Sequence, residues 1–211
     1  MKNIEEIWGK VMLRLFIFFS ALACVLPIYG ADVLWDGPLA SGNTHWSYGP
    51  NWVSGSKPTN SDNAFFNSQN TARWEPTVST SESTQNLTLV ARKLEITADL
   101  TVTDNTFVSA NLELAGGHLA TGNFVLANGS ELTMSPSSNL DISGNVTVLN
   151  STISANGNWT FNGNGQDLTF QDVTLGSNLQ VSSQSATAQS NFSGNLEVRE
   201  FTHSSGNLEI G

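Results

Sequence analysis

From residue 86 onward the chain is dominated by short stretches in which apolar and polar residues alternate. Each stretch begins with Asn or Asp, and the next three positions are apolar, polar and apolar. Alternation of this kind directs one set of side chains into a core and the other into water, as in a half-buried β-strand. The unit occurs ten times, at residues 86–89, 99–102, 111–114, 139–142, 145–148, 167–170, 172–175, 178–181, 195–198 and 207–210.

Helical spacing of apolar residues is not found after residue 30. Between the alternating stretches lie pairs such as Gly116-Gly117, Asn128-Gly129 and Gly144-Asn145, which are expected to supply the positive φ angles of tight turns. The sequence therefore predicts an all-β protein with short strands and a turn after each.

Many short and similar strands favour a solenoid, because none of them can bury an apolar face alone and stacking lets neighbours complete the core. We predict a right-handed parallel β-helix with about 20 residues per coil. A β-sandwich is the alternative, with a barrel as a further one, although both usually have longer strands joined as hairpins.

The first thirty residues differ from the rest and predict a signal peptide, residues 1–30. An apolar run from Leu15 to Ile28 follows Lys10 and Arg14, and cleavage is expected after Gly30. The run is too short to span a bilayer comfortably. Translation starts at Met1 or at Met12. We expect a secreted or cell-surface protein with no transmembrane segment after cleavage of the signal.

Two regions are predicted after the signal peptide. Residues 31–85 are rich in Trp, Pro and Gly, and they form a capping or leader segment over the first strands. Residues 86–211 form the solenoid repeats. Because the chain ends at Ile210-Gly211, directly after a repeat unit, we expect it to be the N-terminal part of a longer protein.

The chain is acidic, with a formal net charge of −10. After residue 30 five Lys and Arg residues face sixteen Asp and Glu residues, so a nucleic-acid partner is not expected. No cysteine follows residue 30, and His45, His118 and His203 have no partner at metal-ligand spacing. The sequence thus predicts no metal site, no cofactor and no catalytic residues.

Aromatic residues provide the one set of candidate binding residues. Trp35, Trp46, Trp52 and Trp74 could form a platform for sugars, because flat rings stack on pyranose faces. They could equally form the core of a small cap, since large aromatic side chains dominate burial. The second interpretation is the favoured one.

The leader motifs are Trp35-Asp36-Gly37, Asn51-Trp52, a turn from Gly55 to Pro58, and Asp62-Asn63-Ala64-Phe65. Together with the repeats they resemble the passenger domains of autotransporter-like bacterial surface proteins. The resemblance implies surface display, with adhesion, self-association or spacing as the role and cell-surface glycans, matrix or a second copy as partners. The translocating β-barrel of that group is not found in this sequence.

An enzyme is the alternative function. A polysaccharide lyase or glycoside hydrolase on a β-helix would need a pair of carboxylates across a cleft. Glu197 with Glu200 and Asp167 with Asp172 are the pairs that the sequence offers. Acids at outward positions of a solenoid are mostly solvated surface charges, so we predict that the protein is not an enzyme.

Overall fold

The computed structural model describes residues 30–37, 42–67, 75–155, 157–161, 167–175, 179–183, 189–193, 201–203 and 207–210. The chain divides into two units, Met1–Gly30 and Ala31–Gly211. The described residues of the second unit form one short 3-10 helix, η1 (Gly49–Asn51), and seventeen strands. The strands are β1 (Asp32–Leu34), β2 (Asn63–Phe66), β3 (Thr77–Val78), β4 (Glu82–Leu89), β5 (Lys93–Ile96), β6 (Asp99–Val108), β7 (Asn111–Leu114), β8 (His118–Leu126), β9 (Glu131–Met134), β10 (Asn139–Ile142), β11 (Val146–Ala155), β12 (Asn158–Phe161), β13 (Asp167–Leu175), β14 (Leu179–Ser183), β15 (Gln189–Ser193), β16 (Phe201–His203) and β17 (Asn207–Ile210).

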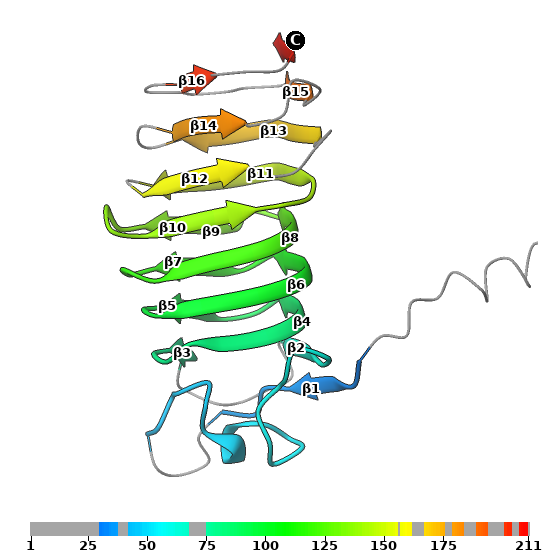
Figure 1. Ribbon diagram of the computed structural model, residues 1–211, viewed down its shortest axis with the longest axis vertical. Helices are drawn as coiled ribbons and strands as arrows, with labels where there is room; N and C mark the ends of the chain where they lie inside the picture. Colours follow the sequence, from blue (N-terminus) through cyan, green and yellow to red (C-terminus); the bar gives the residue numbers. More distant parts are fainter. Residues whose placement is uncertain are drawn as a thin grey trace, which may run out of the picture. The chain divides into compact units, whose positions relative to one another are not determined.

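Every pairing between these strands is parallel, and each joins a strand to one about a coil later in the sequence. Leu94 pairs with Leu112 and Leu112 pairs with Leu132, a repeat of about 20 residues. The colours in Figure 1 accordingly run from blue to red along the stack of strands. The prediction of an all-β parallel β-helix is confirmed.

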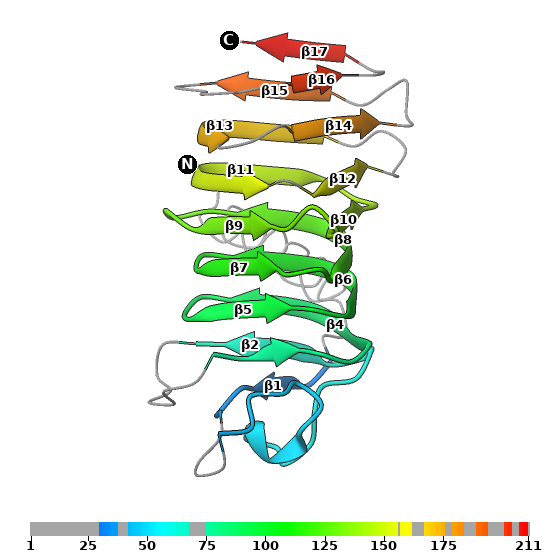
Figure 2. The same ribbon diagram turned by 90° about the vertical axis from the view of Figure 1, so that its left-hand side faces the viewer.

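The strands build three faces, which we name after one member of each. The β2 face contains β1 and β2, the second halves of β4, β6 and β8, the first halves of β11 and β13, and then β15 and β17. The β5 face contains β3, β5, β7, β9 and the second halves of β11 and β13. The β10 face contains the first halves of β4, β6 and β8, followed by β10, β12, β14 and β16. Figure 2 shows β5, β7 and β9 one above the next.

The core follows from the period-two pattern of the strands. Leu100 and Val102 in β6 are buried, whereas Thr101 and Thr103 between and after them are exposed. Directly above Leu100 lies Leu119 and then Leu140, so that like residues stack in the interior. Each coil therefore completes its core only with the help of its neighbours, as expected for a solenoid.

The solenoid begins earlier than the predicted boundary at residue 86. Asp32 pairs with Asn63, and Asn63 pairs with Asn86, so β1 and β2 are already rungs of the β2 face. The leader motif that starts at Asp62 is therefore part of the coil as well as of the cap. Composition alone marked a change at residue 86 because Trp46, Trp52 and Pro58 lie in the connection between these first rungs.

An aromatic cluster forms the core of the cap. The ring of Trp52 packs edge to face against Trp35, Trp46 and Phe66, with its centroid 5.1 Å from Trp35 and 4.9 Å from Trp46. The rings of Trp35 and Trp46 lie tilted against Phe66. Trp52 Nε1 donates a hydrogen bond to the carbonyl oxygen of Trp46 at 2.8 Å. Because Phe66 belongs to β2, the cluster joins the cap to the first coil.

Asn51 ties the leader motifs to one another although it is fully buried. Its side-chain amide donates to the carbonyl oxygens of Asn43 (2.8 Å) and His45 (3.0 Å). The backbone carbonyl oxygen of Asn51 accepts hydrogen bonds from the backbone N–H groups of Asp36 (2.7 Å) and Gly37 (2.9 Å). The Trp-x-Gly and Asn-Trp motifs are thus held side by side by backbone hydrogen bonds.

Unpaired strand edges invite aggregation, and the cap covers them at this end of the solenoid. β1 pairs with β2, while Trp46 N donates to Thr77 O and Thr77 N donates to Thr44 O on the β5 face. On the β10 face Lys57 lies 2.6 Å from the Glu82 carboxylate, whose side chain is almost completely buried. Each of the three faces therefore has a contact with the cap at its first rung.

A ladder of asparagine side chains follows the edge where the chain passes from the β10 face to the β2 face. We call Asn63, Asn86, Asn105 and Asn123 the asparagine ladder. Each amide nitrogen donates to the side-chain oxygen of the rung before it, at 2.8 Å for Asn86 to Asn63, 2.8 Å for Asn105 to Asn86 and 2.9 Å for Asn123 to Asn105. Asp32 Oδ1 accepts from Asn63 at one end, and Asn145 N donates to Asn123 Oδ1 at the other.

We expect the change Asn105→Val to lower the free energy of unfolding by about 1–2 kcal/mol, because it removes two hydrogen bonds of the ladder. Urea unfolding monitored by circular dichroism measures this loss. The control is Asn111→Val, which changes an exposed asparagine at the start of β7 on another face. Equal unfolding midpoints for the two variants would show that the ladder adds nothing to stability.

Candidate binding surfaces

The β5 face carries a group of charged side chains on neighbouring strands. Glu95 and Glu113 are direct neighbours across β5 and β7, and Glu131 follows on β9. Lys93 lies between the acids, with its Nζ 2.7 Å from Glu113 and 3.4 Å from Glu75. The hydrogen bond with Glu113 raises the pKa of Lys93, outweighing the lowering effect of partial burial. This face is a solvated, mainly acidic surface.

The β2 face is uncharged over five successive rungs. Residues 63–67, 86–90, 105–109, 123–127 and 145–149 contain no Asp, Glu, Lys, Arg or His. On the outside of the sheet the asparagine ladder runs beside a second outward row that is neutral and partly aromatic. The members of this row pair directly in register, and all are half-buried: Phe65, Thr88, Phe107, Val125 and Thr147. In a chain with a net charge of −10, this face is the part that another acidic molecule can approach most closely.

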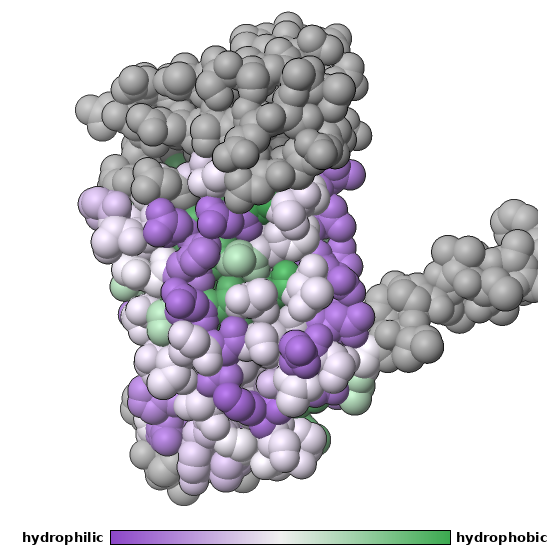
Figure 3. Space-filling model, in the orientation of Figure 1, coloured by the Kyte–Doolittle hydropathy of each residue, from purple (hydrophilic) through white to green (hydrophobic). Residues whose placement is uncertain are grey.

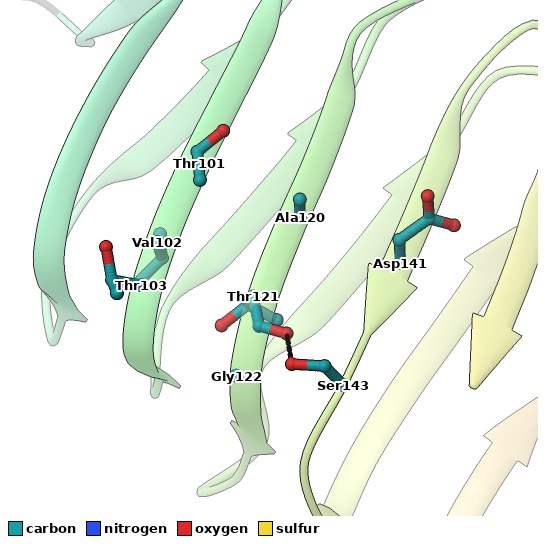
Figure 4. A pocket seen from close by; sticks show the side chains of 8 residues that line it. All are labelled: Thr101, Val102, Thr103, Ala120, Thr121, Gly122, Asp141 and Ser143. Carbon is teal, nitrogen blue, oxygen red and sulfur yellow. Dashed lines mark hydrogen bonds between the residues drawn. The ribbon is translucent and has the colours of Figure 1, made fainter. Parts of the chain in front are cut away.

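The β10 face contains a shallow groove of about 350 Å³ across β6, β8 and β10. The space-filling view in Figure 3 looks onto this face, and Figure 4 shows the lining side chains from close by. Ala120 and Gly122 are small residues of the middle strand, β8, whereas hydroxyl groups stand on both sides of it and one carboxylate stands on the β10 side. We call this feature the β10-face groove, and the residues that define it are Thr101, Thr103, Ala120, Gly122, Asp141 and Ser143.

His118 supports the β10-face groove from the side. Its Nε2 lies 3.0 Å from Oδ2 of Asp141, and each of these side chains is about one third exposed. Ser143 donates a hydrogen bond to the backbone oxygen of Thr121 at 3.3 Å. The sequence analysis did not pair His118 with Asp141, because the two residues are 23 positions apart. A search for polar residues one coil apart would have found the pair.

The candidate sugar platform does not form in the structure. Trp35, Trp46 and Trp52 come together as predicted, but their exposed fractions are 1%, 0% and 2%. Their rings contact one another and Phe66, so their faces are not accessible to a pyranose. Trp74 lies outside the described residues. The burial of the three rings agrees with the favoured interpretation, in which the tryptophans form the core of the cap.

The two carboxylate pairs considered for glycoside hydrolysis lie outside the side chains that the structure describes. Glu197 and Glu200 lie outside the described part of the chain, and so do the side chains of Asp167 and Asp172. One carboxylate, that of Asp141, lines the groove, whereas glycoside hydrolysis commonly uses two.

Within the described ranges no three His, Cys, Asp or Glu side chains gather in a way that could hold a metal ion. None of the described segments forms a helix long and apolar enough to cross a membrane.

Comparisons with protein-family models, with curated proteins and with solved structures found no match to this chain.

Proposed function

We propose that this chain is an exported, extracellular β-solenoid that acts at the cell surface as a structural and adhesive module through self-association. The N-terminal sequence supports export, since an apolar run of this length after basic residues is typical of a signal peptide. The leader motifs support surface display through their resemblance to passenger domains. The observation that carries the proposal is the uncharged β2 face on an otherwise acidic protein.

The electrostatic argument selects the β2 face as the contact between two copies. Two molecules with a net charge of −10 repel each other, and like charges brought face to face cost several kcal/mol. Contact through the β5 face would juxtapose Glu95 and Glu113 of both copies. Contact through the β2 face brings together only amides, hydroxyls and apolar groups such as Phe107 and Val125.

The size of the face implies weak association. Five rungs spaced about 4.8 Å apart, each about five residues long, cover about 400 Å². This is about half of what each partner buries in a standard stable interface. We therefore expect association that depends on concentration and that becomes effective where many copies are held close together on one surface.

Sedimentation velocity over a range of protein concentrations tests this proposal. We expect reversible dimers or small oligomers that grow with ionic strength, because salt screens the long-range repulsion between acidic copies. Phe107→Glu should weaken association by at least about 100-fold, since a two-fold contact brings the new charge in twice. Thr133→Glu, which adds the same charge to the β5 face, should leave the contact intact. A chain that stays monomeric at all concentrations and salt levels would contradict self-association.

A further inference from the structure

The floor of the β10-face groove exists because β8 has small residues where its neighbours do not. Ala120 pairs with Thr101 on one side and with Asp141 on the other. Along these strands the outward side chains of β6 and β10 therefore stand higher than that of β8. The hollow is a property of the side chains and needs no gap between the strands, since the backbone pairing continues through it.

A β-bulge forms the wall of the groove at the edge of the face. Val102 pairs with Thr121 and Asn105 pairs with Asn123, so Thr103 and Asp104 together face the single residue Gly122. A Cβ atom on Gly122 would collide with the backbone oxygen of Asp104. The bulge thus requires glycine at this position, and it leaves Thr103 exposed at the rim. Bulges of this kind are frequent beside functional sites, where they redirect a side chain.

The chemistry of the lining combines several neutral polar groups with one fixed anion. Thr101, Thr103 and Ser143 are exposed and supply hydroxyl groups that can both donate and accept hydrogen bonds. Asp141 supplies a carboxylate that accepts only, and His118 holds one of its oxygens at 3.0 Å. Methyl groups of Ala120 and the threonines provide a small apolar floor (Figure 4).

From this geometry we propose that the β10-face groove binds one residue of a neutral saccharide. Sugar hydroxyls donate to the Asp141 carboxylate and exchange hydrogen bonds with the threonines and Ser143, while the C–H groups of the ring lie over Ala120. Hydrogen bonds to an ionised carboxylate are the strong ones in such a set. The volume of about 350 Å³ is at the lower end of the range for small-molecule sites, which suits a single ring.

The charge of the groove selects against acidic sugars. A uronic acid or a sulfated sugar would bring its anion towards Asp141 on a protein with a net charge of −10. A large apolar ligand would find only the small methyl floor and would cover hydroxyl groups without satisfying them. This site is separate from the β2 face, so it does not depend on the proposed self-association.

Nuclear magnetic resonance on the ¹⁵N-labelled full chain tests the site with glucose, galactose, mannose and N-acetylglucosamine as probes, and with galacturonic acid as the anionic comparison. We expect at least one neutral sugar to shift the amide signals of Ala120, Gly122 and Ser143 with millimolar affinity. No shift with any neutral sugar overturns the proposal. A stronger effect of galacturonic acid than of galactose overturns the assignment to neutral sugars.

Variants locate the binding. Asp141→Asn keeps the shape of the side chain and should weaken binding about tenfold, as expected for loss of a charge-assisted hydrogen bond. Ala120→Phe fills the groove and should abolish the shifts, whereas Thr133→Phe places the same ring on the β5 face and should preserve them. Equal loss in both phenylalanine variants would place binding elsewhere. Phe107→Glu should retain sugar binding, so a failure of self-association and a failure of this site remain distinguishable.

Discussion

Replacement of Trp52 by alanine is expected to lower the free energy of unfolding by about 3–5 kcal/mol, the range for truncation of a large buried aromatic side chain. Trp52 contacts Trp35, Trp46 and Phe66, and it is only 2% exposed. The change also leaves the carbonyl oxygen of Trp46 without its hydrogen bond from Nε1. Denaturant unfolding followed by circular dichroism measures the loss.

The adjacent residue provides the control for this change. Val53 is 62% exposed, and its backbone N–H still donates to Leu34 O after truncation of the side chain. Val53→Ala should therefore change stability by less than about 0.5 kcal/mol. If Trp52→Ala were equally mild, the aromatic cluster would not be the element that joins the cap to the first coil.

The second large effect is expected from Gly117→Ala, at about 3 kcal/mol, the upper end for overpacking. Gly117 lies in the connection from β7 to β8, where the chain turns against the preceding coil. A Cβ atom here would lie 2.6 Å from the backbone oxygens of Ala98 and Ile96. Because both contacts are to backbone atoms, the strands themselves must move to make room.

Gly116 separates this effect from the ordinary cost of replacing a glycine. Its φ angle is 93°, but a Cβ atom there would meet only the Ser137 hydroxyl, at 3.5 Å. Gly116→Ala should thus cost about 1–2 kcal/mol from backbone conformation alone. Thermal unfolding of both variants shows which substitution lowers stability more. A greater loss of stability for Gly116→Ala than for Gly117→Ala would contradict the close-packing argument for Gly117.

These two glycines show what sequence reasoning could and could not resolve. Both were expected to supply positive φ angles, yet only Gly116 has one, while Gly117 is required for the close approach of neighbouring coils. The requirement at Gly117 comes from residues about twenty positions earlier. A local pattern cannot contain it, because it arises only when the coil returns.

The period-two pattern predicted the inward and outward residues of the strands well, because burial in a sheet alternates with the pleat. The same unit occurs on all three faces, however, so the sequence did not reveal which strands stack. Three rungs of the asparagine ladder fell outside the unit. At Asn63 and Asn123 the outward residue two positions later is apolar, Phe65 and Val125 respectively. At Asn105 the next inward residue is Thr106, whose buried hydroxyl pairs with that of Thr121 at 2.9 Å.

The candidate surfaces depended still more on the stacking. The uncharged β2 face joins five segments that are far apart in sequence, and the groove needs Thr101, Ala120 and Asp141 to lie on adjacent strands. Neither feature has a local motif. The tryptophans were easier to interpret, because the clustering of large aromatic side chains within the leader favoured a buried cap core over an exposed platform.

The parallel stacking has a mechanical consequence. Backbone hydrogen bonds between coils point along the direction of stacking, so a sufficient pulling force on a chain end separates the coils one after another. Release of one coil of about 20 residues adds up to about 70 Å of extended chain. A solenoid built in this way lengthens stepwise under load, and each step dissipates work.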